Sequence, residues 1–495
     1  MARVPLLSGS RVAVVDVPEG GVVLRPPAPS QELDDVAAGL REALRFPLAG
    51  ETLEQLVTRG GTATIVIEPP SLPIPSTHVD PRHGAIGAAV DELERLGVAH
   101  VTILVAGGLA RRPSPREIGS LVPPEARRRF RGRVLVHDAE ADDLVELGES
   151  DGVPLRVSRA LVETDLVLTV TAAESILHGG PSAFVRASGV EPLRAAGATS
   201  LLETGSSRGW ELAVATERLL AERVRLFGIS LALNLPRVFG GYPYEEQILE
   251  RLARSKLRRG FSLLPAAGRE RLMERVPREL TAAAIYGGRP STAHSEALLR
   301  AIEFKGTVLA EPLDAIVIGI PSTTAFLPRG RPNPVSAAYL GLGLALRFWR
   351  NAFPVRPGGS AILLHDLNRR FPPPTQTPYR ALFADPRSAR NPVALREVER
   401  AAAADAHAIA AYRAGQAVHP LEPFVAWSAC DAVASRLGSV LVAGCRDAHA
   451  ARQLGFVPVH GIGAALGMAQ AGGAERIGFL LSPPYFPLLV EDPSP

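Results

Sequence analysis

Short runs of apolar and β-branched residues alternate along the first half of the chain with amphipathic helical patterns. The clearest runs are residues 62–67, 100–105, 134–137 and 166–170. Between the first two, the segment AIGAAVDELERLGV repeats apolar residues at helical spacing, and the pattern stops at Gly97. Strands that alternate with helices in this way predict a parallel sheet covered by helices.

The second half of the chain repeats the pattern. Strands are expected at residues 314–320, 360–365, 439–443 and 477–481, and helices at about 335–349 and 448–454. Residues 240–300 mix Gly, Pro and Arg with helical stretches such as 244–257, and are expected to connect the halves. The sequence therefore predicts an α/β protein of two Rossmann-like domains, 1–275 and 276–495, with a cleft between them.

The composition is globular and argues against several classes of protein. The chain has 495 residues, of which 46% are hydrophobic and 21% charged, so disorder is not expected. The net charge is +3 without a basic block, which argues against a nucleic-acid partner. The longest apolar stretches are shorter than the roughly 20 residues of a membrane-spanning helix. Two cysteines without CxxC spacing fit a reducing cytoplasm, so we expect a soluble cytoplasmic protein.

Several segments follow one another in a recognisable order. They are VLRPPAP, TATIVIEPPSLPIPS, VTILVAGGLARRPSPREI, AAESILHGGPSAFVRASG and the tail DAHAARQLGFVPVHGIGAALGMAQAGGAERIGFLLSPPYFPLL. Together they resemble the nickel-dependent lactate racemase family. The resemblance implies a racemase or epimerase that inverts a small 2-hydroxy acid by moving its α-hydrogen, as hydride, to and from a nickel-pincer nucleotide. Such chemistry needs a base on each side of the substrate hydroxyl and a cation for the carboxylate.

The family's first motif is a strand followed by Asp-x-Thr-Arg-Pro, whose loop contacts cofactor phosphate and substrate. Here Pro69 stands at the aspartate and Leu72 at the arginine. Ser71 and Ser76 are the cofactor-binding candidates, because hydroxyls and backbone amides bind anions. An ordinary proline-rich turn is the alternative.

The second motif, Gly-Thr-His-Arg-Pro, supplies one of the two bases. The matching segment AGGLARRPS has Ala110 at the histidine and Arg111 at the arginine. Arg111 is a candidate catalytic residue, because a guanidinium pairs with a carboxylate or a phosphate. A solvated loop arginine is the alternative.

The third motif, Glu-Pro-His followed by Gly-Gly-Ala-Lys, supplies the second base and the lysine that tethers the cofactor. Ile176 stands at the histidine and Arg186 at the lysine, while His178 lies two residues further on. His178 is the other catalytic candidate and Arg186 a cofactor-binding one; a polar residue beside a glycine turn is the alternative for His178. The family's nickel-binding histidine falls near Leu202, so the metal ligands are unknown.

Lysine is nearly absent from the chain. Of 54 basic residues only Lys256 and Lys305 are lysines. A covalent link to the cofactor needs a nucleophilic amine, which a guanidinium does not supply. The nickel-pincer nucleotide is therefore not expected to be held by the family's usual bond, and both lysines are expected to be surface charges.

The loop after the strand at 314–320 reads PSTTAFLPRGRPNP and contains two more candidates. Ser322 and Thr323 are expected to contact a cofactor, because such loops lie where parallel sheets bind ligands. Tyr339 is a loose match to a tyrosine of the family's polar loop and helix.

Two functions remain open. One is a 2-hydroxy acid racemase or epimerase in which the usual catalytic residues are replaced and the cofactor is held without the tether. The other is a non-catalytic paralogue that binds a nucleotide or a small organic anion. Bound nickel and a hydride-accepting chromophore distinguish the first from the second.

Overall fold

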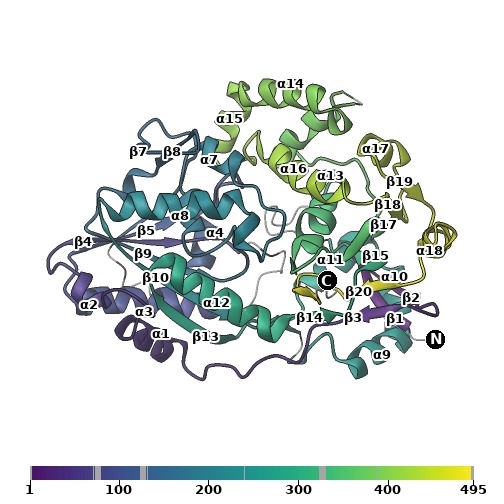
Figure 1. The fold of residues 1–495 in the computed structure, drawn as a ribbon, viewed down its shortest axis with the longest axis horizontal. Coiled ribbons are helices and arrows are strands. Elements are labelled where there is room, and N and C mark those ends of the chain that lie inside the picture. Colours follow the sequence, from purple (N-terminus) through teal and green to yellow (C-terminus); the bar gives the residue numbers. More distant parts are fainter. Residues whose placement is uncertain are drawn as a thin grey trace.

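The structure, a computed structural model, describes residues 3–70, 72, 80–122, 130, 132–238, 240–322, 331–385 and 387–491. The described residues form two six-stranded sheets. Figure 1 shows the two sheets side by side, the first mostly in purple and teal and the second mostly in green and yellow. The α/β class that the sequence predicts is confirmed.

The first sheet has the strand order β13-β10-β9-β4-β5-β6. Its neighbours pair in parallel, except that β13 runs antiparallel to β10. The central strand β9 is buried along its whole length, which explains its unbroken apolar and β-branched run. The strands are β4 (Thr62–Ile67), β5 (His100–Val105), β6 (Arg133–Val136), β9 (Leu166–Ala172), β10 (Arg225–Leu233) and β13 (Ala282–Gly288).

Helices cover the first sheet. Ile86 and Leu93 of α3 are buried, as their helical spacing predicts. α1 packs on α3 and β13, and α12 packs on β10 and β13. The helices of this half are α1 (Val36–Arg45), α2 (Leu53–Leu56), α3 (Pro81–Arg95), α4 (Pro115–Leu121), α6 (Ser182–Arg186), α7 (Val190–Ala195), α8 (Arg208–Ala221) and α12 (Pro290–Lys305).

The second sheet has the order β19-β18-β17-β15-β20-β3 and is parallel throughout. Its strands are β3 (Val22–Leu24), β15 (Leu313–Gly319), β17 (Val355–Leu364), β18 (Ser439–Ala443), β19 (Val457–Val459) and β20 (Ile477–Leu480). Thus β3 joins the sheet of the second half, whereas β13, which follows residue 275, joins the first sheet. The division into domains at 275 stays a prediction.

The remaining elements are shorter strands and the other helices. The strands are β1 (Arg3–Ser8), β2 (Arg11–Asp16), β7 (Val145–Ser150), β8 (Val153–Val157), β11 (Arg237–Val238), β12 (Arg278–Glu279), β14 (Thr307–Leu309), β16 (Trp349–Arg350) and β21 (Leu488–Val490). The helices are α9 (Glu246–Arg254), α10 (Lys256–Leu263), α11 (Ala266–Glu274), α13 (Pro334–Ala338), α14 (Pro392–Ala403), α15 (Ala406–Arg413), α16 (Glu422–Ala434), α17 (Ala448–Gln453) and α18 (Ile462–Ala471). None of the helices in the described ranges combines the length and the apolar character needed to cross a membrane.

The helix predicted at 335–349 differs from the structure after its first turn. It continues from α13 as a π-helical segment, Tyr339–Leu344, and then as a 3-10 turn, Ala345–Arg347. Gly341 brings the segment close to its neighbours, since an added Cβ would lie 2.8 Å from a methyl carbon of Leu363. Short π-helical segments are frequent at functional sites, and this one presents Tyr339 to the cavity described below.

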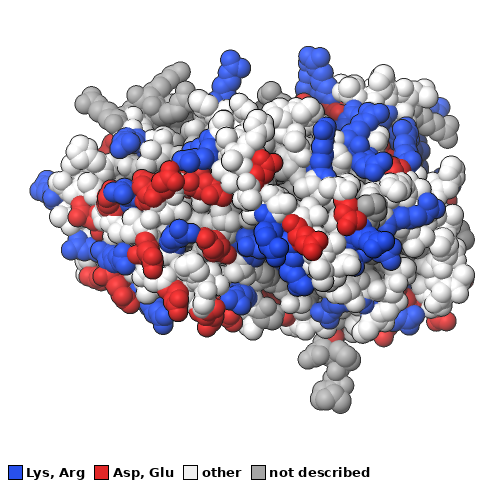
Figure 2. Space-filling model, turned by 90° about the horizontal axis from the view of Figure 1, so that it is seen from above, with Lys and Arg blue, Asp and Glu red and all other residues white. Residues whose placement is uncertain are grey.

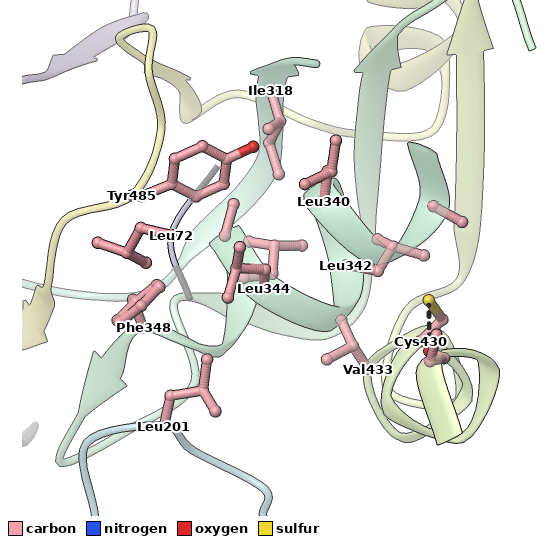
Figure 3. Close-up of a cluster of buried hydrophobic side chains, with 14 of the residues drawn as sticks. Leu72, Leu201, Ile318, Leu340, Leu342, Leu344, Phe348, Cys430, Val433 and Tyr485 are labelled. Carbon is pink, nitrogen blue, oxygen red and sulfur yellow. Dashed lines mark hydrogen bonds between the residues drawn. The ribbon is translucent and has the colours of Figure 1, made fainter. Parts of the chain in front are cut away.

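The same segment is anchored in the core. Leu340, Leu342 and Leu344 are buried, and Figure 3 shows them in a cluster that also contains Ile318 and Tyr485. These buried leucines lie between Tyr339 and Arg347 in the chain. Core packing of the leucines therefore sets the position of Tyr339 and Arg347.

Candidate anion-binding cavity

A cavity of about 440 Å³ lies between segments of the two halves of the chain. Its size is within the range of small-molecule sites. The first half contributes the loop and helix that follow β9, and the second half contributes the π-helical segment and α16. The polar and charged residues that line it are His178, Ser182, Arg186, Arg194, Thr199, Arg208, Tyr339, Arg347, Glu422 and Ser428.

His178 lies in the loop between β9 and α6 and is buried. Its Nδ1 is 2.9 Å from Oγ of Ser175, which leaves Nε2 available to a ligand. Burial lowers the pKa of His178 well below its usual value, and the nearby cations Arg186 and Arg347 lower it further. The imidazole is therefore neutral at physiological pH, as a general base must be before it accepts a proton.

The His178 loop is held tightly by His294 of α12. Gly180 adopts a φ of +53°, and an added Cβ would lie 2.3 Å from Cβ of His294. Nε2 of His294 is 3.0 Å from the Ser175 carbonyl oxygen, and burial lowers the pKa of His294 to about 4. The neutral His294 ring donates a hydrogen bond to this carbonyl oxygen and so holds the His178 loop in place. The glycine turn beside His178 is therefore required by close packing.

Arg186 connects the cavity to a buried carboxyl group at the end of β4. Its Nη2 donates to the Gly107 carbonyl oxygen at 3.0 Å, and its Nε lies 3.3 Å from Oε1 of Glu68. That contact is not aligned as a hydrogen bond, since both atoms lack a hydrogen-bond partner among the described residues. Burial raises the pKa of Glu68 to about 7, even though Arg186 opposes the shift. Arg186 is therefore only partly neutralised.

Arg347 is a buried cation without a carboxylate partner in the described part of the chain. Arg347 is only 3% exposed. Nη1 donates to the carbonyl oxygen of Gly343 at 3.2 Å and Nη2 to that of Ala198, while Nε has no partner in these ranges. Burial lowers the pKa of Arg347, because removal from water disfavours the charged form. An unpaired buried guanidinium is costly unless an anion binds beside it.

Tyr339 and Glu422 complete the wall formed by the second half. Burial raises the pKa of the Tyr339 hydroxyl to about 12 and that of the Glu422 carboxyl to about 7. The positive charge of Arg186 opposes both of these pKa shifts, and that of Arg347 opposes the shift of Tyr339. The cavity thus contains two arginines at depth, a neutral imidazole, a phenol and a carboxyl group that titrates near neutrality.

The structure brings together some of the predicted site residues. His178, Arg186 and the loosely matched Tyr339 all line the cavity, together with Ala110, which the sequence resemblance predicts to stand at a histidine of the family. Arg111 is outside the lining, where its guanidinium pairs with Glu117 and donates to the Gly415 carbonyl oxygen.

Other predicted residues lie elsewhere. Ser322 is buried just after β15 and does not line this cavity. Ser71, Ser76 and Thr323 lie outside the described residues. Arg347 and Glu422 were missed by sequence reasoning. A lone arginine inside the apolar run 337–348 was the available signal for Arg347, and no sequence signal pointed to Glu422.

The described residues do not fit a lysine-tethered nickel-pincer nucleotide. Lys256 is exposed, and Lys305, expected at the surface, is half-buried with its pKa lowered by burial to about 8; neither lines the cavity. Within the described ranges no three His, Cys, Asp or Glu side chains come together as metal ligands. Leu202, near which the sequence resemblance predicts the family's nickel-binding histidine, is buried in the apolar core.

Comparisons with known proteins agree with the fold described above. Residues 9–178 match the sequence family of the lactate racemase N-terminal domain. The lactate racemase apoprotein of Thermoanaerobacterium thermosaccharolyticum has a similar fold, with a TM-score of 0.62 at 13% identity over 99% of this chain and 100% of that one. A protein from Thermotoga maritima has a TM-score of 0.51 at 12% identity over 93% of this chain and 100% of that one. No curated protein matches the sequence.

These matches confirm the resemblance that the sequence indicates. The chain is lactate racemase-like in sequence over residues 9–178 and in fold over nearly its whole length. The low identity fits a divergent relative.

Proposed function

We propose that the protein binds a small organic acid of the 2-hydroxy acid class in this cavity. The observation that carries the proposal is Arg347, a buried guanidinium that lines the cavity and has no carboxylate partner in the described ranges. Carboxylates bind guanidinium groups through two parallel hydrogen bonds, and burial strengthens such pairs. The carboxylate of the acid supplies the negatively charged partner that Arg347 lacks among the described residues.

Neighbouring groups suit the rest of such a ligand. His178 offers a neutral ring nitrogen for a hydroxyl, Tyr339 lines the cavity beside it, and Arg186 adds positive charge. Charges of both signs lie on the face shown in Figure 2. The cytoplasm remains the predicted location, which the free thiols of Cys430 and Cys445 support.

Calorimetric titration tests this proposal. We expect saturable binding of lactate to one site and no binding of lactamide, which has the same shape without the negative charge. Absence of lactate binding at millimolar concentration would contradict the proposal, and equal binding of lactamide would show that charge is not what the cavity recognises.

Racemisation or epimerisation of that acid by hydride transfer is the second candidate function. It is favoured by the match of residues 9–178 to the lactate racemase domain and by the position of His178 in the same cavity as Arg186. Because the sequence predicts that the tether and the nickel histidine are replaced, this reaction requires a nickel-pincer nucleotide held without the family's covalent bond. A paralogue that binds the acid without converting it is the alternative.

Co-expression with enzymes that make the pincer nucleotide separates these outcomes. Stoichiometric nickel, pincer absorbance and an unchanged intact mass would support a noncovalently held cofactor. Protein that binds lactate but carries neither nickel nor chromophore would favour the non-catalytic paralogue.

The affinity for the acid is expected to depend on pH through two carboxyl groups. Glu68 and Glu422 both have a pKa raised to about 7, so each loses its negative charge as the pH falls through that value. Protonation removes repulsion of the bound carboxylate and leaves Arg186 less neutralised. His178 stays neutral in this range, because its pKa lies well below 6.5. Lactate should therefore bind about fivefold or more tightly at pH 6 than at pH 8. Titrations in matched ionic strength check this, and tighter binding at the higher pH would contradict it.

A further inference from the structure

Glu422 differs in charge from the other ionisable groups of the cavity. Among the described lining residues it is the only carboxylic acid, whereas four are arginines. Two of those arginines already have other acidic partners, since Arg186 lies beside Glu68 and Arg194 pairs with Glu399 at 2.7 Å. No salt bridge within the described ranges joins Glu422 to any of the four. The carboxyl group therefore lies in a cationic cavity without a salt bridge to any of these arginines.

The groups around Glu422 leave its carboxyl group without a hydrogen bond that a ligand could supply. Glu422 is the first residue of α16, which packs against α13, the Tyr339–Leu344 segment and the turn Thr377–Phe383. The charged and titratable groups that these surroundings bring near it are Arg186, Tyr339 and Tyr379. Its side chain is half-buried, so it has lost part of its hydration without gaining a hydrogen bond from these neighbours. A hydroxyl group in the cavity would restore one.

We propose that Glu422 recognises the hydroxyl group of the bound acid and so makes the cavity selective for hydroxy acids. This inference rests on the proposed function, because it requires an acid held by Arg347. Arg347 attracts the ligand's carboxylate and Glu422 repels it, so the acid is oriented with its carboxylate toward Arg347 and its hydroxyl toward Glu422. An acid that lacks the hydroxyl leaves Glu422 without a partner and binds less well.

Lactate and propionate test this selectivity, because they differ only by the hydroxyl group. In calorimetric titrations wild-type protein should bind lactate about tenfold or more tightly than propionate. Glu422→Leu should abolish the preference, and propionate should bind at least as tightly as it does to the wild type. Glu422→Gln keeps a hydrogen-bond acceptor of the same size and should keep part of the preference. Glu397→Gln, at an exposed position of α14, is the matched control and should behave as wild type.

The outcomes separate this inference from the function on which it rests. If the wild type binds both acids equally, or if Glu422→Leu keeps the full preference for lactate, Glu422 does not recognise the hydroxyl although the acid site stands. If wild type binds neither acid, the proposed function itself fails and this inference fails with it. Melting followed by circular dichroism identifies a variant that has lost its fold, in which case the Glu422→Gln result decides.

Discussion

Replacing Arg347 by methionine is expected to weaken lactate binding by about 30-fold or more, since loss of one partner of a buried charge pair costs about 2–5 kcal/mol. Methionine has a similar length and fills the space without the charge. Arg347→Lys keeps the charge but not the paired donors of a guanidinium, so its affinity should fall between those of the wild type and Arg347→Met. Calorimetric titration measures all three.

A structural effect of these variants is separable from a binding effect. Arg347 also donates to the carbonyl oxygens of Gly343 and Ala198, so Arg347→Met should melt at a lower temperature than wild type. Arg350→Met serves as control, because Arg350 lies three residues away and outside the cavity. Wild-type affinity in a folded Arg347→Met protein would contradict the account.

Replacing Gly180 by alanine is expected to lower the free energy of unfolding by about 2–5 kcal/mol, through backbone strain and steric overlap. Gly180 has a φ of +53°, which a residue with a Cβ rarely adopts, and that Cβ would lie 2.3 Å from His294 Cβ and 3.0 Å from the Pro290 carbonyl oxygen. His294 is itself fully buried and cannot move aside cheaply. Urea unfolding followed by circular dichroism measures the change.

Gly152→Ala isolates the backbone contribution to this effect. Gly152 has a φ of +73° and nothing within 4 Å of an added Cβ, so only the strain of a left-handed conformation applies. That strain is about 1 kcal/mol. Equal destabilisation in the two variants would mean that His294 does not support the His178 loop as described.

Eight of the twelve strands in the two large sheets were predicted from sequence because their physical cause is local, whereas β3, β10, β13 and β19 were not among the predicted runs. β4, β5 and β18 have the predicted bounds, β15 is shifted by one residue at both ends, and β20 is one residue shorter than predicted. Central strands covered on both faces need apolar, β-branched side chains throughout, so they appear as continuous runs. The pairing of β3 with β20 and of β13 with β10 was not predictable in this way, since it joins segments far apart in the chain.

The candidate site was predictable only in its first half. His178 and Arg186 belong to a segment of the sequence that resembles the lactate racemase family, and both line the cavity. Arg347 reaches it because a π-helical segment replaces a regular helix, and that depends on glycine packing against a neighbouring strand. Glu422 begins a helix, where acidic residues are common for reasons unrelated to ligands. Its role depends on which arginines of the cavity already have other acidic partners. Only the folded structure reveals those pairs.

A crystal structure with bound lactate tests the central claim most directly. We expect the carboxylate of lactate within hydrogen-bond distance of the Arg347 guanidinium and the hydroxyl on the side of Glu422 and His178. Lactate bound elsewhere, or in this cavity without contact to Arg347, would contradict it.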